Sequence, residues 1–385
     1  MEKDIYKKLL TLGLQSSTVR SRILTLSSLW QKLENEKILF NAAKTDEVAS
    51  HLGWLLKQSN LQYGNFWIEE LEKVEVRMQV LMETLELFAS SLAQSNIHIV
   101  ALKNAGIAKG IYPVLACSPM GDIDLLVSSK DFHKAHDIIV KELGFTFKFR
   151  SELEEENLEE AFKGGGTEYY KEINGYTVWL ELQWRPIAGR WIQPHNEPKG
   201  DDLMNRSVAI EGSSVRILSP EDNLLQVCLH TAKHSYVRAP GFRLHSDVDR
   251  IVRYQEINWD KFISNTLNLQ LKTAVYFSLF FAKDLLNTPI PQRVFESLKP
   301  SWYRDKIIHY YVNKAGIFNQ KKKKFSRLGY IIFNLSLYDS MGENMKAIFP
   351  PLDTMRLRYP KCSSINIPYY WGIRLMNLVF KRATL

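Results

Sequence analysis

Residues 120–127 read MGDIDLLV, and this stretch places two carboxylates inside an apolar run that is typical of a β-strand. Successive side chains of a strand point to opposite faces, so Asp122 and Asp124 are expected on one face and Ile123 on the other. Two like charges on one face repel each other and resist burial. A divalent cation removes this conflict, because Mg²⁺ prefers hard oxygen ligands and is commonly held by carboxylates. For an isolated pair of this kind, a strand end with two solvated aspartates is the alternative.

Length and net charge bound the kinds of fold and partner. The chain has 385 residues, enough for two or three domains, and its 45% hydrophobic and 24% charged content is ordinary for a globular protein. The net charge of +8 at pH 7 indicates contact with something anionic, such as a nucleotide, RNA or an acidic membrane surface. A run of four lysines at residues 321–324 is typical of a solvated loop, with approach to an anionic partner as the alternative.

Cysteine usage and apolar runs indicate the compartment. The three cysteines, Cys117, Cys228 and Cys362, are far apart and form no C-x-x-C pair. This spacing argues against a disulfide framework and a cysteine-based zinc site, and it favours the reducing cytoplasm. The first residues lack the apolar stretch of a signal peptide, and no run approaches the ~18 residues of a membrane-spanning helix. We therefore expect a cytoplasmic protein without a transmembrane segment.

Hydrophobic patterns divide the chain into three predicted regions, and the predicted fold class is α+β. Residues 1–93 read as an N-terminal helical region, which leads into a long helix over residues 74–95 without Gly or Pro. Residues 94–217 read as the core, a small mixed sheet flanked by helices, with the strand of residues 120–127 at its centre. Residues 218–385 read as a C-terminal helical region rich in aromatic side chains.

Turn and charge signals complete the pattern of the core. Two extended runs flank Asn174-Gly175, a dipeptide typical of a type I′ hairpin turn. The glycines at 164–166 precede a strand rather than a helix, so they read as a turn or flexible lid and not as a phosphate-binding loop. The acidic run 152–160 is typical of a solvated helix face. The remaining predicted elements are strands at 97–102, 168–173 and 176–184 and helices at about 105–112 and 131–143.

The second strand of the predicted hairpin carries a third acid. Glu181 shares a face with Trp179 and Gln183, and an unpaired carboxylate among apolar neighbours is costly to bury. The strand pattern alone leaves two interpretations open. Glu181 is either a surface-facing residue or a member of a metal or catalytic centre.

A later helix begins with strong N-terminal signals and carries two histidines. Ser219 is expected as its N-cap, with Pro220 at the first helical position. His230 and His234 lie four residues apart on one face, a spacing that suits zinc, but no glutamate stands between them as in H-E-x-x-H. A polar or phosphate-contacting cluster of these histidines with Lys233 is therefore favoured over a metal site.

Together these motifs resemble the nucleotidyltransferase superfamily typified by DNA polymerase β, and more closely its branch of uncharacterised nucleotidyltransferase family proteins. The likeness covers residues 75–255 well and the remainder loosely. The branch has glycine, arginine and histidine at the positions of Asn104, Ser118 and Gln183, and these three residues depart from its pattern. The matching segments are Leu102-Lys103-Asn104, Ser118 to Asp124, Glu181 to Trp184, Ser219 to Asp222, His230-x-x-Lys233-His234 and Asp247.

The resemblance implies a nucleotidyltransferase that depends on Mg²⁺ or Mn²⁺. It would move an NMP from an NTP, such as ATP, to an acceptor on a small molecule, peptide, protein or RNA. Asp122, Asp124 and Glu181 are the implied metal ligands and catalytic residues, and Glu181 would also orient or deprotonate the acceptor. The implied nucleotide-binding residues are Lys103, Asn104, Ser118, Gln183, His230, Lys233 and His234.

The three departures from the family pattern leave an alternative open. They favour a catalytically decayed module that binds nucleotide or RNA on the same scaffold. A toxin-like transferase that acts on tRNA is a third possibility. The sequence does not choose among acceptors.

Overall fold

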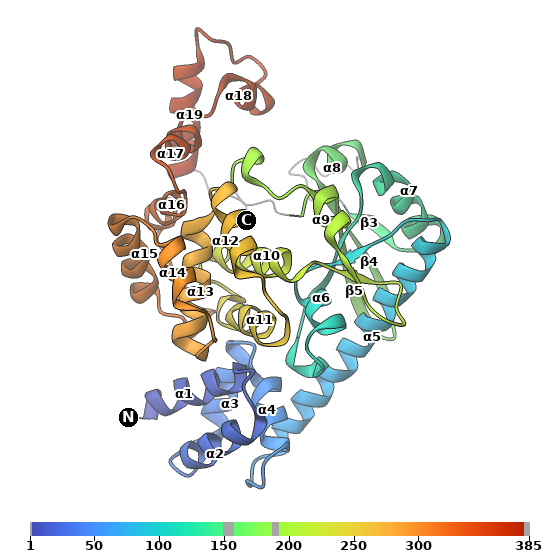
Figure 1. Ribbon diagram of the computed structural model, residues 1–385, viewed down its shortest axis with the longest axis vertical. Coiled ribbons are helices and arrows are strands. Elements are labelled where there is room, and N and C mark those ends of the chain that lie inside the picture. Colours follow the sequence, from blue (N-terminus) through green and yellow to red (C-terminus); the bar gives the residue numbers. More distant parts are fainter. Residues whose placement is uncertain (1, 149–157, 187–191, 381–385) are drawn as a thin grey trace.

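A seven-stranded mixed sheet, flanked by helices, lies on the right in Figure 1, which shows the computed structural model; the structure describes residues 2–148, 158–186 and 192–380. The strand order is β3-β4-β5-β2-β1-β7-β6, and neighbours are antiparallel except for the parallel pairs β2–β5 and β1–β7. The predicted α+β fold is confirmed. The strands are β1 (Val100–Ala101), β2 (Asp122–Leu126), β3 (Thr146–Lys148), β4 (Gly166–Ile173), β5 (Tyr176–Gln183), β6 (Val208–Ala209) and β7 (Arg216–Ile217).

Strand β2 presents apolar side chains to one face of the sheet and acidic side chains to the other. Ile123 and Leu125 are fully buried in a hydrophobic cluster that includes the long helix α5 (Phe66–Gln94), which runs beside the sheet in Figure 1. Burial of each such side chain contributes about 1.5–3 kcal/mol. Asp122 and Asp124 point the other way, because side chains alternate along a strand. A register slip of one residue would bury both aspartates in this core, so the apolar face fixes the register.

The hairpin β4–β5 brings the third acid next to β2. Asn174 and Gly175 have φ angles of 50° and 78°, and both lie in the left-handed region that a type I′ turn requires, so this prediction is confirmed. Of the glycines at 164–166, Gly164 ends a helix, Gly165 forms the expected turn and Gly166 begins β4. Gly165 has a φ of 97°, and its carbonyl accepts hydrogen bonds from the backbone nitrogens of Trp184 and Arg185.

Helices at the N-terminal end form a separate small core that also packs on the C-terminal region. Its hydrophobic cluster includes Leu9, Leu52 and Trp67 together with Phe242 and Leu286 from distant helices. These N-terminal helices lie at the bottom of Figure 1. They are α1 (Glu2–Leu14), α2 (Val19–Trp30), α3 (Glu36–Thr45) and α4 (Ala49–Lys57).

The largest hydrophobic cluster is built by the C-terminal helices around α10, α11 and α13. Among the described residues, no helix is long and apolar enough to cross a membrane. Ser219 caps α10 as predicted, with its hydroxyl accepting from the backbone nitrogen of Asp222. These helices are α10 (Pro220–Lys233), α11 (Gly241–Tyr254), α12 (Trp259–Asn268), α13 (Lys272–Leu286), α14 (Gln292–Leu298), α15 (Trp302–Ala315), α16 (Arg327–Ser336), α17 (Met341–Ile348), α18 (Leu352–Arg358) and α19 (Ile367–Phe380).

Several predicted boundaries differ from the observed elements. The strand expected at 97–102 is reduced to the two residues of β1, which pair with β2 on one side and with β7 on the other. The helix expected at 131–143 continues beyond α7 as a π-helical turn. The helix expected at 105–112 begins two residues earlier, and residues 152–157 of the acidic run lie outside the described part of the chain. The shorter helices are α6 (Lys103–Gly110), α7 (Phe132–Asp137), α8 (Leu158–Gly164) and α9 (Gly200–Arg206), with the π-helical turn at Ile138–Glu142.

Asp249 on α11 ties the N-terminal helices to the C-terminal region. Its carboxylate is fully buried. It accepts hydrogen bonds from the backbone nitrogen of Ser16 at 2.9 Å, from the hydroxyl of Thr288 at 2.8 Å and from Nε of Arg253 at 2.8 Å. These donors compensate the loss of hydration of the carboxylate, so the contact stabilises only when all partners are present.

We predict that Asp249→Asn lowers the free energy of unfolding by about 1–3 kcal/mol, because an amide NH₂ group would face donors instead of accepting from them. Denaturant midpoints measure the change. Asp260→Asn is the control, since Asp260 forms an ion pair with Arg293 in which the side chains are 76% and 55% exposed, and such pairs contribute less than about 1 kcal/mol. Equal effects of the two substitutions would contradict the role of Asp249.

Candidate active site

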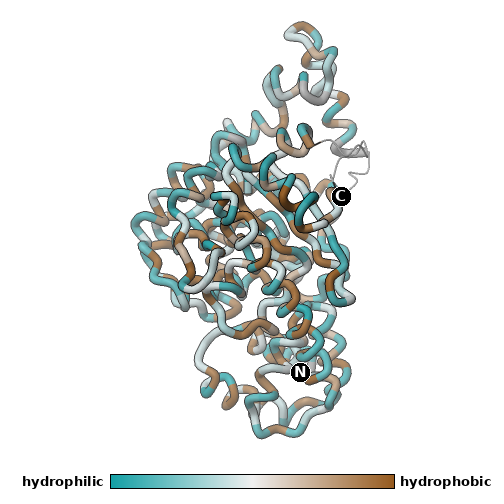
Figure 2. Tube along the Cα trace, turned by 90° about the vertical axis from the view of Figure 1, so that its right-hand side faces the viewer, coloured by the Kyte–Doolittle hydropathy of each residue, from teal (hydrophilic) through white to brown (hydrophobic). Residues whose placement is uncertain are grey.

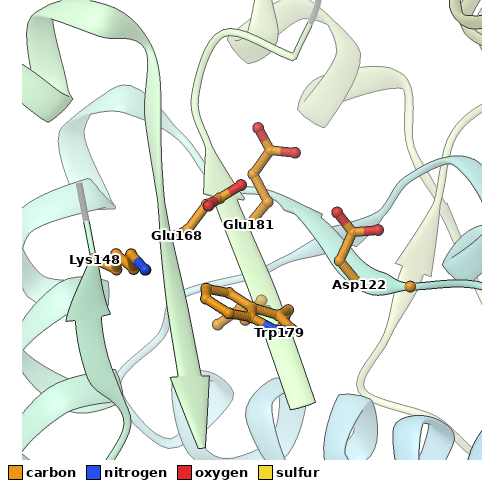
Figure 3. A pocket seen from close by; sticks show the side chains of 7 residues that line it. Asp122, Lys148, Glu168, Trp179 and Glu181 are labelled. Carbon is orange, nitrogen blue, oxygen red and sulfur yellow. The ribbon is translucent and has the colours of Figure 1, made fainter. Parts of the chain in front are cut away.

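Asp122, Asp124 and Glu181 converge on one face of the sheet. The parallel strands β2 and β5 pair Asp124 with Glu181 and Asp122 with Trp179. One carboxylate oxygen of each acid lies within 4.8 Å of the other two. Asp124 is buried, whereas Asp122 and Glu181 are half-buried, and Figure 3 shows these two side chains standing over the same face. Three hard oxygen donors at this spacing fit a divalent cation such as Mg²⁺ or Mn²⁺.

Lys103 supplies the positive charge among these acids. Its Nζ lies 2.5 Å from Oδ1 of Asp124 and 3.7 Å from Oε2 of Glu181. Burial lowers the pKa of Lys103, but the charges of Asp124 and Glu181 outweigh burial and raise this pKa above its usual value. Burial raises the pKa of the Asp124 carboxyl, which the charge of Lys103 opposes. A charged ammonium thus lies where a metal ion would bind.

Two amide side chains hold this arrangement. Nε2 of Gln183 donates to Oδ1 of Asp124 at 3.0 Å, so Gln183 lies at the predicted site. Lys103 begins α6 with a φ of 50°, in the left-handed region that residues other than glycine rarely adopt. Its backbone nitrogen donates to Oε1 of Gln226 on α10 at 3.3 Å. Gln226 was not among the predicted residues, although it lies one helical turn before His230 and on the same face.

Asn104 and Ser118, two further predicted site residues, are both buried. Nδ2 of Asn104 donates to the carbonyl of Pro119 at 3.0 Å, which fastens α6 to the segment before β2. The Ser118 hydroxyl accepts from Nη1 of Arg250 at 3.1 Å. Both side chains therefore support the backbone around the site in this structure, and their predicted contact with nucleotide stays a prediction.

The histidines of α10 lie close enough to Lys103 for its charge to lower their pKa values. Burial lowers the pKa of His230 well below its usual value, and the charge of Lys103 lowers it further. Burial also lowers the pKa of His234 to about 4, and its Nδ1 donates to the carbonyl of Ala239 at 2.6 Å. Both rings are neutral near pH 7, so they offer hydrogen bonds rather than charge. Lys233 is exposed. Within the described residues, the acidic triad is the one cluster with metal-ligand spacing, so no zinc site at these histidines is found.

A pocket of about 430 Å³ opens beside Glu181. The register of the sheet places Lys148, Glu168 and Glu181 in one row across β3, β4 and β5. Nζ of Lys148 lies 5.5 Å from the centroid of the Trp179 ring. Sequence reasoning missed Lys148, because β3 has only three residues and shows no strand pattern. It also missed Glu168, which the predicted hairpin with its turn at Asn174-Gly175 places opposite Glu181. The lining residues, five of them labelled in Figure 3, are Gly121, Asp122, Lys148, Glu168, Trp179, Leu180 and Glu181.

We predict that Lys103→Met increases the affinity for Mn²⁺ in the absence of nucleotide by at least about tenfold, because the ion no longer competes with an ammonium for Asp124. Calorimetry or the paramagnetic resonance of free Mn²⁺ measures this affinity. Lys109→Met is the matched control, since Lys109 lies on the same helix but pairs with Glu86 instead of with the triad. Unchanged or weaker Mn²⁺ binding in Lys103→Met would contradict the competition.

Comparison with known proteins identifies the family of the chain. A solved structure of an antigenic nucleotidyltransferase-like protein from Paracoccidioides brasiliensis is similar to this chain, with 16% sequence identity and a TM-score of 0.35. The match covers 57% of this chain and 97% of that chain. No curated protein matches the chain. A family model described as an uncharacterised nucleotidyltransferase matches residues 34–287, which include the triad and Lys103. Because this match spans well over half of the sequence, the chain belongs to the uncharacterised nucleotidyltransferase family.

Proposed function

We propose that the chain is a Mg²⁺-dependent nucleotidyltransferase that moves an NMP from an NTP, such as ATP, to an acceptor hydroxyl. The observation that carries this proposal is the convergence of Asp122, Asp124 and Glu181 on one face of the sheet. Membership of the family supports the reaction class. A cytoplasmic location is part of the proposal, because all three cysteines are buried and unpaired.

The triad supplies the groups that the reaction needs. Asp122, Asp124 and Glu181 would hold the metal ions, which activate the acceptor hydroxyl and stabilise the departing pyrophosphate when bound. Glu181 lies at the pocket, so it is suited to orient the acceptor and to take the proton of its hydroxyl. The acceptor oxygen forms a bond to the α-phosphorus, and the bond from that phosphorus to the bridging oxygen breaks to release pyrophosphate.

Lys103 is suited to change partners when the nucleotide arrives. The anionic oxygens of a triphosphate would bind the Lys103 ammonium. Metal ions would then bind Asp124 and Glu181 in place of Lys103. The start of α6 adds backbone N–H groups that favour a phosphate. Gln226 keeps the backbone of Lys103 in place during this exchange, since it binds the nitrogen and not the side chain. The neutral His230 and His234 and the exposed Lys233 lie on the α10 side, where they would contact the nucleotide.

The pocket beside Glu181 is the proposed acceptor site. Its volume of about 430 Å³ falls in the range of small-molecule sites, and it would equally admit the end of a peptide, protein or RNA. Trp179 offers a flat apolar surface, and Glu168 is an acceptor of hydrogen bonds. The pocket is lined by Asp122 on β2 as well as by Glu181 on β5, so an acceptor there would lie next to the proposed metal ligands.

We predict transfer of label from ATP labelled on the α-phosphate, but not on the γ-phosphate, to a component of a fractionated cell extract in the presence of Mg²⁺. Asp122→Asn, Asp124→Asn and Glu181→Gln should each reduce transfer by at least about 100-fold, and a double variant should lose little more, because residues that act together are not additive. Asp137→Asn, which removes an exposed acid paired with Lys141, is the control and should retain full activity. Transfer of γ-label alone would identify a kinase instead.

A catalytically decayed binding module is the second candidate, and two contacts favour it. Ser118 is fully buried and bound by Arg250, and the amide of Asn104 is bound to Pro119, so neither is free to meet a phosphate in this structure. Calorimetry with ATP separates the candidates. Nucleotide binding that ignores Mg²⁺ and persists in Asp122→Asn would support the module, and binding that requires both would support the enzyme.

A further inference from the structure

Positive charge is concentrated at one end of this chain. Residues 321–385 contain 12 Lys and Arg but only three Asp and Glu, a net charge of +9. The whole chain contains 50 Lys and Arg and 42 Asp and Glu, so residues 1–320 contain 38 and 39 and carry a net charge of −1. The basic character of the protein is therefore a property of this segment and not of the fold that holds the candidate active site.

The same segment exposes apolar side chains. Helix α19 carries one charged side chain, Arg374, yet none of residues 367–377 is buried. Ile365, which precedes this helix, is 91% exposed, and Met376 within it is 64% exposed. A helix that is apolar around most of its surface is normally buried in a core. Its exposure indicates that something else covers it.

The neighbouring helices extend this surface. Met341 and Met345 are exposed and lie one turn apart on α17, and Leu328 is exposed on α16. Helices α17 to α19 project from the main body at the top of Figure 1, and Figure 2 shows hydrophobic stretches within this projecting part. We refer to residues 321–380 as the C-terminal arm. Large exposed apolar patches of this kind mark interaction sites.

We propose that the C-terminal arm binds the surface of an anionic lipid bilayer. Basic side chains attract anionic headgroups, and apolar side chains next to them enter the boundary between headgroups and acyl chains. The aromatic residues Tyr369, Tyr370 and Trp371 at the start of α19 belong to the types that are enriched at membrane interfaces. The 14 residues of α19 extend about 21 Å, less than the ~30 Å hydrocarbon core, so the helix would lie along the surface.

Charge and side-chain chemistry favour lipid over two other occupants. A second copy of the chain would bring another basic segment, residues 321–385 with a net charge of +9, against the first, and like charges repel. A nucleic acid would use the basic and aromatic side chains of the arm, but it would leave the exposed aliphatic side chains of Ile365, Met341 and Met376 without an apolar partner. Lipid binding goes beyond the proposed transferase reaction and does not depend on it.

The test is co-sedimentation of the full chain with vesicles. We expect binding to vesicles of 30% phosphatidylglycerol in phosphatidylcholine, little binding to pure phosphatidylcholine, and weaker binding at 0.5 M salt, since salt screens surface charges. The triple variant Lys321→Ala, Lys322→Ala, Lys323→Ala should reduce the partition constant by roughly 100-fold. Lys324 is kept, because its Nζ donates to the carbonyls of Gly316 and Phe318.

A matched control removes three exposed lysines at the other end of the chain, Lys3, Lys7 and Lys8, and should leave binding unchanged. A second variant, Ile365→Ser with Met376→Ser, should weaken binding at unchanged charge, and circular dichroism verifies that each variant is folded. Absence of binding to the anionic vesicles, or equal loss in the control, would overturn the proposal. Dimerisation in light scattering or retention of RNA, without lipid binding, would assign the arm to those partners instead.

Discussion

Mutual repulsion among Asp122, Asp124 and Glu181 is the constraint on which the site depends. Two unit charges 4 Å apart repel by about 4 kcal/mol at an effective dielectric constant of 20, so three carboxylates on one sheet face require a cation. The apolar face of β2 prevents them from turning away, because the register is fixed by the buried core. Lys103 provides the cation in the metal-free protein. One ammonium among three carboxylates leaves excess negative charge, which suits divalent ions.

Helices α10 and α11 position Lys103 and the chain segment before β2. Gln226 of α10 binds the backbone of Lys103, which holds its left-handed conformation at the start of α6. Arg250 of α11 donates to the carbonyl of Cys117 and to the hydroxyl of Ser118, and its guanidinium lies 4.2 Å from the centroid of the Tyr112 ring. Helices α10 and α11 therefore support the site, because they position the two chain segments that lead into it.

Strong local patterns made the core of the site predictable from the sequence. Alternation along β2 placed Asp122 and Asp124 on one face. The Asn174-Gly175 turn placed Glu181 on the second strand of the hairpin, which is β5. The short strands were not predictable, because two or three residues carry no periodicity. Lys148 was missed for this reason, whereas Glu168 lies on the predicted hairpin, whose register already places it opposite Glu181. The contact of Lys103 with Asp124 was missed because it depends on a left-handed backbone that no local signal announces.

We propose above all that this triad is a metal site, and that Lys103 pairs with its carboxylates in the absence of nucleotide. A crystal of the protein soaked in Mn²⁺ with a non-hydrolysable NTP analogue tests it most directly, because the anomalous scattering of manganese locates the ion without ambiguity. The account predicts a manganese peak among Asp122, Asp124 and Glu181, with the Lys103 ammonium moved away from Asp124. Bound nucleotide without a manganese peak, and with Lys103 still on Asp124, would contradict it.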